Sequence, residues 1–298
     1  MLLYMNQFSI FIEKKGIVGE KKNILYNGLI TNPRVKISEQ RNVCDYIFID
    51  FRDFDALGKY TMEHFKKMII IDFRDQANII NIPCFKYFKR SVVNKNLMKF
   101  REYNREIIPI SYCLRNESLH LDSFKHIREY ERDTDISIFF PYNDKINQNR
   151  LLSKEIARYI FDNFKNYKTH VGLCGEKGPK GRNSIQREYF EKMFHSKIVV
   201  NCNPDNWEGD YRTWEALSSG ALVFVDNMIT PVIHPLVHGK HVIFYDRNNR
   251  SDLKTKLLYY LNHPDLARKI AMEGNQFAID HHKPSDRIDE ILNHLPKK

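Results

Sequence analysis

The sequence lacks the features that mark disulfide-rich, zinc-binding and membrane-spanning proteins. Its five cysteines are spread along 298 residues without a Cys-x-x-Cys pair, and their number is odd. This spacing argues against a disulfide framework and a structural zinc site, and it favours a reducing compartment. No apolar run is long enough to span a bilayer, and the N-terminus has neither a basic leader nor a cleavage site. We therefore expect a soluble protein of the cytoplasm (the host cytoplasm if the source is viral) with no membrane span.

A concentrated basic region is also missing, although the formal net charge is +10. Such a charge suits nucleic acid, an anionic membrane or a phosphorylated substrate. Lysine and arginine are nevertheless scattered, with only short clusters at residues 86–90 and 177–182, and no nucleic-acid-binding motif is present. We expect a solvated basic surface and no nucleic-acid partner. A Walker loop, a nucleophile elbow and the kinase signatures are absent as well.

Short apolar runs alternate with amphipathic segments along most of the chain. The strands expected from these runs are 23–26, 46–51, 68–73, 107–112, 136–140, 170–173, 197–202, 221–225 and 241–245, with another at the N-terminus. The helices expected from the amphipathic segments are 150–164, 184–194, 211–219, 251–261 and 264–280. Continuous apolar strands alternating with helices predict doubly wound α/β domains with parallel sheets. The length and a charged segment at 128–135 predict two domains, 1–133 and 134–298.

The most informative segment runs from Ser196 to Asp226 and is expected to form a strand, a loop, a short helix, a glycine turn and a strand. The helix places Arg212 and Glu215 three residues apart, so both side chains project from one side. A guanidinium pairs with phosphate oxygens, and a carboxylate accepts hydrogen bonds from ribose hydroxyls. This pair therefore suits a nucleotide-sugar. The alternative is an ion pair on the helix surface.

Motifs in the C-terminal half resemble the exostosin-type glycosyltransferase domain, and residues 241–290 are similar to GT-B glycosyltransferases more broadly. The motifs that carry the resemblance are Gly181-Arg182, Arg187-Glu-Tyr189, Met193, Ser196-Lys197, Pro204, Tyr211-Arg212-Thr-Trp-Glu215-Ala216-Leu217, Gly220 and Val225-Asp226. Two places depart from the exostosin pattern. Ile198–Val200 replaces a Phe-Cys-Leu-like strand, and Ala221–Val223 replaces a Cys-x-Pro sequence. The substrate of a particular exostosin therefore cannot be transferred.

The resemblance implies a GT-B fold of two Rossmann-like, doubly wound domains facing a cleft. It also implies an inverting enzyme that needs no metal or other cofactor, with a UDP-sugar as the commonest donor and UDP-xylose among the options. The acceptor would be a hydroxyl of a glycan or glycoprotein. On this basis Glu215 contacts the donor ribose, and Arg212 lies near the diphosphate. The remaining donor-binding candidates are Arg182, Lys89, Arg90, Ser196, Lys197, Asp210 and Tyr211.

The N-terminal half offers carboxylates for the catalytic base that an inverting transferase requires. Two strands each end in Asp-Phe-Arg-Asp, at residues 50–53 and 72–75. Asp72 and Asp75 are the first candidates, and Asp50 and Asp53 are the second. Loop capping or pairing with a neighbouring arginine is the alternative for each of them.

Two further functions remain open. A metal-dependent GT-A transferase would use an Asp-x-Asp triplet, and Asp53-Phe-Asp55 is the better placed of two. A non-catalytic module that binds a sugar nucleotide or a glycan would keep the fold without transferring the sugar. Two histidine pairs, at 281–282 and at 234 and 238, suggest zinc, but we expect packing or surface histidines. The second pair lacks the glutamate of a zincin, and Pro235 opposes a regular helix there.

Overall fold

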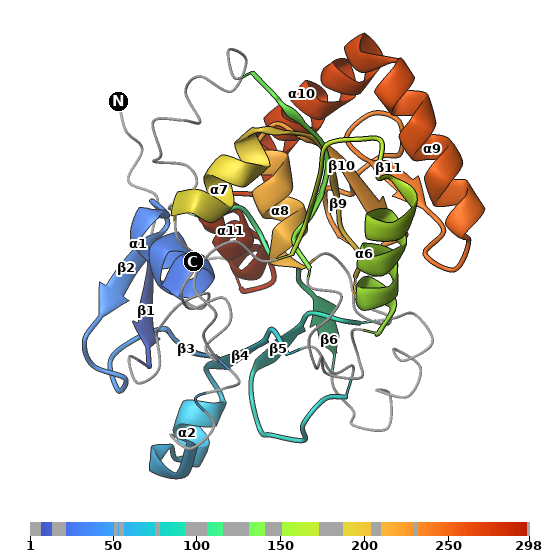
Figure 1. Cartoon of the computed structure of the whole chain (residues 1–298). Coiled ribbons are helices and arrows are strands. Elements are labelled where there is room, and N and C mark those ends of the chain that lie inside the picture. Colours follow the sequence, from blue (N-terminus) through green and yellow to red (C-terminus); the bar gives the residue numbers. More distant parts are fainter. Residues whose placement is uncertain are drawn as a thin grey trace, which may run out of the picture. The chain divides into compact units, whose positions relative to one another are not determined.

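The chain forms two compact units (Figure 1). The computed structural model describes residues 7–13, 22–50, 53, 57–74, 78–92, 106–115, 131–140, 151–172, 187–203, 210–228 and 232–296. Unit 1 contains Met1–Asn116, Ile229–Val232 and Lys283–Lys298, and unit 2 contains Glu117–Met228 and Ile233–His282. The sequence analysis placed residues 283–298 with the C-terminal domain, whereas they belong to unit 1.

Unit 1 contains a six-stranded parallel sheet in the order β2-β1-β3-β4-β5-β6. Its elements are β1 (Phe8–Ile12), η1 (Lys22–Tyr26), α1 (Asn27–Thr31), β2 (Val35–Ser38), β3 (Tyr46–Asp50), α2 (Met62–Phe65), β4 (Met68–Asp72), β5 (Lys86–Lys89), β6 (Ile107–Pro109) and α11 (Pro284–Asn293). The central strand β4 is buried along its whole length. Its continuous apolar sequence fits a parallel strand that is covered on both faces.

The predicted strand at residues 23–26 is wrong. These residues belong to η1, a π-helical segment in which Ile24 and Leu25 are buried. An apolar run of four residues fits a buried strand and a buried helix equally well, so its pattern could not decide between them.

The last helix of the chain, α11, packs against η1 and α1 at the beginning of the chain. The two helices approach so closely that a Cβ atom on Gly28 would lie 2.6 Å from the carbonyl oxygen of Pro284. An ion pair of 2.9 Å between Arg34 and Asp289 adds to this contact. Unit 1 is therefore completed by a segment that is more than 250 residues away in the sequence.

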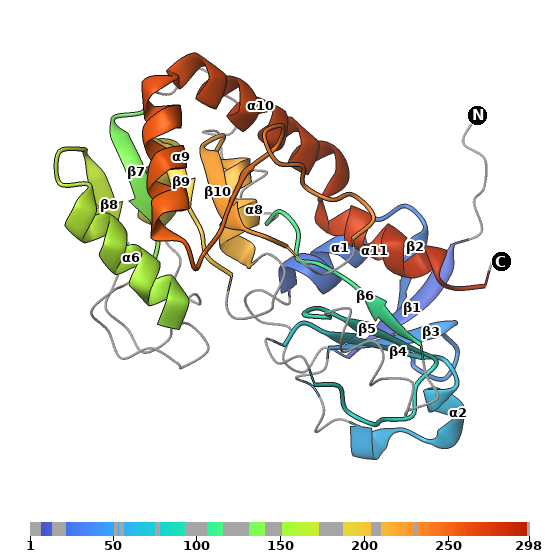
Figure 2. The same cartoon turned by 90° about the vertical axis from the view of Figure 1, so that its right-hand side faces the viewer.

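Unit 2 contains a five-stranded parallel sheet in the order β11-β10-β9-β7-β8. Its elements are β7 (Thr134–Ile138), α6 (Leu151–Asn163), β8 (Thr169–Val171), α7 (Arg187–Phe194), β9 (Ser196–Val200), α8 (Tyr211–Ser218), β10 (Leu222–Asp226), β11 (Ile243–Tyr245), α9 (Arg250–Asn262) and α10 (Pro264–His281). Helices α6 and α9 cover one face of the sheet, and α7 and α8 cover the other (Figures 1 and 2). The helices and strands predicted for this part of the chain are confirmed, with small shifts at their ends.

The two sheets share one strand order, in which the third strand lies beside the first. The direction of winding thus reverses between β1 and β3 in unit 1 and between β7 and β9 in unit 2. In doubly wound sheets, ligands bind outside the carboxyl ends of the strands at this reversal, which is called the switch point. None of the helices in the described part of the chain has the length and hydropathy that a bilayer span requires.

Candidate functional site

A polar cluster lies at the carboxyl ends of the strands in unit 2, next to the switch point. Four elements of the sheet and the first turn of α8 contribute to it. We call it the edge cluster of unit 2, and its members are Phe140, Asn203, Asp210, Arg212, Asp226 and Arg247. Phe140 follows β7 and Asn203 follows β9, so the two strands at the reversal of winding both lead into it.

Asp210 caps the N-terminus of α8 and orients Arg212. One carboxylate oxygen of Asp210 accepts a hydrogen bond from the backbone N–H of Arg212 at 2.5 Å, and the other pairs with Nη1 of Arg212 at 2.6 Å. An aspartate is favourable at this position because it satisfies a helix N–H and faces the positive end of the helix dipole. The guanidinium carbon lies 4.9 Å from the ring centre of Phe140. Nε of Arg212 is buried and has no hydrogen-bond partner among the described residues.

Asn203 joins the end of β9 to the start of α8. Its backbone N–H donates to Asp226 at 2.6 Å, and its side-chain oxygen accepts from the backbone N–H of Asp210 at 3.3 Å. Nη1 of Arg247 donates to the carbonyl oxygen of Asn203 at 3.1 Å. The side-chain nitrogen Nδ2 of Asn203 is buried and, within the described ranges, has no hydrogen-bond partner. An amide donor and a guanidinium donor are therefore both left unsatisfied at this edge, which is costly in a protein interior unless a ligand pairs with them.

Asp226 ends β10 and is almost completely buried. Burial raises the pKa of its carboxyl group to about 7, although the backbone N–H of Asn203 and the charge of Arg247, whose Nη1 lies 3.4 Å away, act in the opposite direction. A buried carboxyl group disfavours its charged form. The edge cluster thus contains a group that titrates close to neutral pH.

Glu215 lies one turn further along α8. It is completely buried, and one of its carboxylate oxygens accepts a hydrogen bond of 2.8 Å from the hydroxyl group of Tyr189 on α7. The side chain of the intervening Thr213 accepts a hydrogen bond of 2.6 Å from Asn201. Because Arg212 and Glu215 are both buried, the alternative of an ion pair on the helix surface is wrong.

The predicted donor-binding residues of unit 2 divide into two groups. Asp210, Tyr211, Arg212 and Glu215 lie together on the first turns of α8 and its cap. Ser196 and Lys197 lie at the amino end of β9, the opposite edge of the sheet. There the hydroxyl of Ser196 is 2.6 Å from that of Ser137, and Lys197 pairs with Asp135 at 2.7 Å.

The structure therefore does not bring Ser196 and Lys197 together with the residues of α8. Arg182 lies outside the described residues.

A second charged cluster lies at the carboxyl ends of β4 and β5 in unit 1. Asp72 accepts hydrogen bonds from Nε and Nη2 of Arg74 at 3.0 and 2.9 Å, and from the hydroxyl of Tyr87 at 2.7 Å. The ammonium group of Lys89 lies 3.3 Å from Asp72 and donates to the carbonyl oxygen of Arg74 at 3.2 Å. Asp72 and Lys89 are completely buried. Both carboxylate oxygens of Asp72 are thus bound by neighbouring side chains.

The ionisation of this second cluster fits an internal ion pair. Burial by itself would raise the pKa of Asp72, but the hydrogen bonds from Arg74 and the charge of Lys89 outweigh it and leave the pKa lowered. Burial lowers the pKa of Lys89 to about 8, despite the nearby carboxylate. A carboxylate with a lowered pKa is a weak base, so these contacts favour structural pairing over proton abstraction at Asp72. Of the other candidates, Asp50 is buried, Asp53 is half-buried and Asp75 lies outside the described residues.

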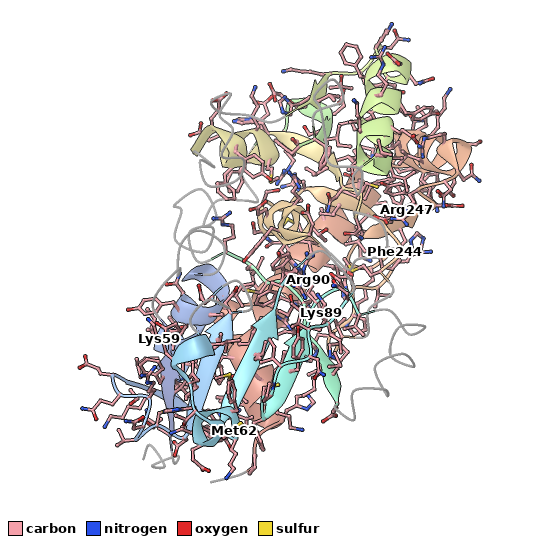
Figure 3. The ribbon with its side chains drawn as sticks, turned by 90° about the horizontal axis from the view of Figure 1, so that it is seen from below. Lys59, Met62, Lys89, Arg90, Phe244 and Arg247 are labelled. Atoms are coloured by element: carbon pink, nitrogen blue, oxygen red, sulfur yellow. The ribbon has the colours of Figure 1, made fainter. Side chains whose placement is uncertain are left out.

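Arg90 follows Lys89 at the same edge of the sheet, and Figure 3 shows the two side chains beside each other. Nε of Arg90 donates to the carbonyl oxygen of Phe73 at 3.3 Å, and its guanidinium carbon lies 4.2 Å from the ring centre of Tyr112. The next residue, Ser91, has a φ of 66°, which is uncommon for a residue other than glycine. The chain therefore turns sharply where β5 ends.

The sequence analysis assigned no role to Asn203, Asp226 or Arg247. Asn203 and Asp226 were recognisable in principle, since each follows or ends a strand that the sequence predicts and parallel strands share one carboxyl edge. Arg247 (Figure 3) is different, because nothing in its neighbouring sequence separates it from the many other arginines. Among the described residues, no three His, Cys, Asp or Glu side chains gather in a way that would hold a metal ion.

Comparisons with known proteins agree with this architecture. Residues 157–293 match a family model described as "Glycosyl transferase-like". The chain matches no curated protein sequence at a significant level.

Solved structures of similar fold cover nearly the whole chain. An alpha-glucosyltransferase in complex with UDP and a 13-mer DNA containing an HMU base has a TM-score of 0.62 and 10% identity, over 96% of this chain and 99% of its own. HepE of Anabaena, solved with UDP and glucose, has a TM-score of 0.57 and 10% identity, over 97% and 100% of the two chains. A glycosyltransferase from Rickettsia africae has a TM-score of 0.57 and 12% identity, over 97% of each chain.

The fold is therefore GT-B, with two Rossmann-like domains, and the family match supports a glycosyltransferase. This fold contradicts the GT-A alternative. The exostosin type is a finer assignment than these findings support.

Proposed function

We propose that this protein is a glycosyltransferase that moves a sugar from a nucleotide-sugar donor, bound at the edge cluster of unit 2, to an acceptor hydroxyl. The observation that carries the proposal is the pair of buried donors without described partners, Nε of Arg212 and Nδ2 of Asn203, beside the N-terminus of α8. A helix N-terminus and an arginine attract phosphate oxygens. A bound diphosphate would satisfy both donors.

Each residue of the edge cluster has a role in this proposal. Arg212 and Asn203 donate hydrogen bonds to the diphosphate and stabilise the charge that grows as it leaves. Asp210 keeps the guanidinium group in place through its two hydrogen bonds. Glu215, oriented by Tyr189, accepts hydrogen bonds from the ribose hydroxyls.

We extend the proposal to finer properties that the resemblance to exostosins implies. The donor is a UDP-sugar, with UDP-xylose among the options, and transfer inverts the anomeric carbon without a metal ion. Two of the similar structures contain UDP, which supports UDP as the first nucleotide to test. The acceptor is a glycan or glycoprotein hydroxyl, and the enzyme works in the cytoplasm.

The catalytic base of the proposed reaction is Asp72 or Asp75. The saturated contacts and lowered pKa of Asp72 favour Asp75. The base takes the proton of the acceptor hydroxyl while that oxygen bonds to the anomeric carbon and the bond to the diphosphate breaks. Comparing kcat for Asp72→Asn and Asp75→Asn identifies it, since loss of the base lowers kcat far more than it changes KM.

The donor site is tested by titrating nucleoside diphosphates into the protein in EDTA and in Mn²⁺, using calorimetry and thermal shift. A ligand of the native state raises the melting temperature. We expect UDP to bind in EDTA, and we expect Arg212→Ala to weaken it about 100-fold, because a charge-assisted hydrogen bond is lost. Glu215→Gln should lower the affinity for UDP but leave the affinity for inorganic diphosphate unchanged, since only UDP carries a ribose.

Asp162→Asn is the matched control, since this carboxylate is exposed on α6 and pairs only with Arg158 among its described contacts. The proposal fails if no nucleotide binds under either condition, or if Arg212→Ala binds UDP as tightly as the control. Binding without hydrolysis or transfer would favour the non-catalytic module. The acceptor panel should include glycans and, because one similar structure was solved with it, DNA containing an HMU base.

A further inference from the structure

Five aromatic side chains of unit 2 gather where α10 meets α8. We call them the aromatic cluster, and they are Trp214, His234, Phe277, His281 and His282. The ring centres of Trp214 and His282 lie 4.2 Å apart, and those of His234 and His281 lie 4.4 Å apart. Phe277 joins the two pairs, with its ring 5.5 Å from His282 and 4.8 Å from His281. His281 and His282, expected to be packing or surface histidines, both make ring contacts in this cluster; His281 is half-buried and His282 is buried.

Trp214 belongs to the same helix as the proposed donor-binding residues, between Arg212 and Glu215. Its side chain is 1% exposed, and its indole N–H has no hydrogen-bond partner among the described residues. Within the described part of the chain, packing rather than a hydrogen bond holds the indole ring. The imidazole of His282, tilted by 34° against it, is therefore one of the surfaces that set its position.

The C-terminal end of α8 is fixed separately, by α10. Nδ2 of Asn275 donates to the carbonyl oxygens of Leu217 and Ser218 at 2.8 and 3.1 Å. Gly274 allows α10 to lie close to its neighbours, since a Cβ atom there would be 3.0 Å from the side chain of Leu217 on α8 and would clash with the backbone oxygen of His241. These contacts stop α8 from sliding, while the stack on His282 acts one turn earlier and limits its rotation.

We propose that His282 is a positioning residue for the donor site, which through Trp214 fixes the rotation of α8 and hence the directions of Arg212 and Glu215. This inference rests on the proposed function. Successive residues of a helix are about 100° apart around the axis, so a shift of the Trp214 ring also turns its neighbours on both sides. Misplacing a binding group by about 1 Å can cost about 100-fold in rate.

His282 is also the residue at which the chain leaves unit 2, because unit 1 resumes at Lys283. The chain also crosses between the units earlier, because residues 229–232 belong to unit 1 and unit 2 resumes at Ile233. His234 directly follows this crossing. The stack of His281 on His234 thus joins the two connections within unit 2.

The test compares His282→Ala and His282→Phe with the matched control His241→Ala. His241 is a buried histidine whose ring stacks on Phe277 at 3.9 Å and, among the described residues, has no ring contact with Trp214. The measurements are the UDP affinity by calorimetry, the urea midpoint, and hydrogen exchange of the α8 backbone amides. Both alanine variants should lower the midpoint. Only His282→Ala should lower the affinity for UDP, by about 10-fold or more, and accelerate hydrogen exchange of the α8 amides. His282→Phe should restore the UDP affinity and the exchange rates to within about threefold of wild type.

The proposal is overturned if His282→Ala and His241→Ala bind UDP equally well, or if His282→Phe folds but restores neither affinity nor protection. If His282→Ala does not fold, His282→Leu replaces it, since leucine fills most of the volume without a flat ring. If the wild-type protein binds no nucleoside diphosphate, the proposed function has failed; if it binds one other than UDP, that nucleotide replaces UDP in the comparison. The exchange of α8 still decides whether His282 positions the helix.

Discussion

At the carboxyl ends of β4 and β5 in unit 1, the described charged groups bind one another, whereas at the edge cluster of unit 2 two buried donors have no partner among the described residues. Asp72 accepts from Arg74 and Tyr87 and lies beside Lys89, so its carboxylate is saturated. At the edge cluster of unit 2, Nε of Arg212 and Nδ2 of Asn203 are buried without described partners. Both clusters are buried and contain arginine, yet of the two only the edge cluster of unit 2 has side-chain donors without a partner among the described residues.

The two clusters also differ in their place within the same strand order. The edge cluster of unit 2 adjoins β7 and β9, where the winding reverses, while Asp72 and Lys89 end β4 and β5, away from the reversal between β1 and β3. A buried charge alone therefore does not mark a binding site. Unsatisfied donors at the switch point are a more specific sign of a binding site. Ligands bind at that edge of the sheet, and a fully paired carboxylate has no further hydrogen bonds to make with them.

The largest expected effect comes from breaking the saturated cluster. Asp72→Ala leaves the ammonium of Lys89 and the guanidinium of Arg74 without their anion, and removing one partner of a buried pair costs about 3–5 kcal/mol. Trp207 and Trp214 both belong to unit 2, so tryptophan fluorescence follows unit 2 while circular dichroism follows both units.

We expect the urea transition seen by circular dichroism to move to lower urea in Asp72→Ala, with the fluorescence transition and the UDP affinity unchanged. Asp72→Asn keeps a hydrogen-bond acceptor and should therefore destabilise unit 1 less than Asp72→Ala does. A large loss of UDP affinity in a stably folded variant would show that the two clusters do not differ as described.

The next effect concerns Asp226, because burial raises the pKa of its carboxyl group from the ordinary value of 3.8 to about 7. A carboxyl group with a raised pKa in the folded state stabilises the fold fully below pH 3.8, and this stability is lost as the pH rises through 7. The shift corresponds to at most about 4 kcal/mol.

Asp226→Asn cannot ionise but can still accept from the backbone N–H of Asn203. The difference in unfolding free energy between this variant and wild type should therefore grow in the variant's favour from pH 5 to pH 8. Urea unfolding followed by tryptophan fluorescence measures it. A difference that is constant with pH would mean that Asp226 keeps an ordinary pKa.

A smaller effect tests the unsatisfied donor itself. Asn203→Asp keeps the oxygen that accepts from Asp210 but replaces the unpartnered amide with a carboxylate oxygen. Near a diphosphate this oxygen repels, so the Kd for UDP should rise about 10-fold or more, which is about 1.4 kcal/mol.

Asn163→Asp makes the same chemical change on the exposed end of α6, where the amide binds only the carbonyl oxygen of Tyr159 among its described contacts. It should leave the Kd for UDP unchanged. Equal affinities for the two variants would remove Asn203 from the donor site.

The smallest effect lies at the turn after β5. Ser91 has a φ of 66° and donates to the carbonyl oxygen of Arg74 at 3.2 Å. Ser91→Gly and Ser91→Ala both lose this hydrogen bond, but only glycine adopts a positive φ without strain. The glycine variant should be the more stable of the two by about 1 kcal/mol, measured by circular dichroism during urea unfolding. The reverse order would show that the turn is not strained.

Sequence reasoning anticipates unit 2 better than unit 1, for physical reasons that particular residues illustrate. β9 and β10 contain the apolar runs Ile198–Val200 and Leu222–Val225, and Pro264 fits the first position of α10, so local preference and tertiary structure agree. In unit 1, β2 has no continuous apolar run, and β5 begins and ends with a lysine, so the sequence predicted neither strand. The predicted helices did not include α11 either, because the partners that hold it lie at the other end of the sequence.

The candidate site was predicted in the same uneven way. Arg212 and Glu215 were recognisable from their spacing on one helix, and the structure places Asp210 and Tyr211 beside them. Saturation of Asp72 was not predictable, because it depends on Tyr87 and Lys89 from another strand. Spacing along a chain indicates which side chains share a helix, but it says nothing about which buried donors remain without a partner.

The return of α11 to unit 1 affects how the protein is made. The surface of η1 and α1 that packs against α11 lies within the first 31 residues, and Ile24, Leu25 and Leu29 of these two helices are buried. Its cover, α11, leaves the ribosome only after nearly all of unit 2 has been synthesised. Throughout translation, the faces of η1 and α1 that contact α11 are exposed on an incomplete N-terminal unit. Synthesis that stops before residue 284 would leave them uncovered and expose the nascent chain to chaperones and proteases.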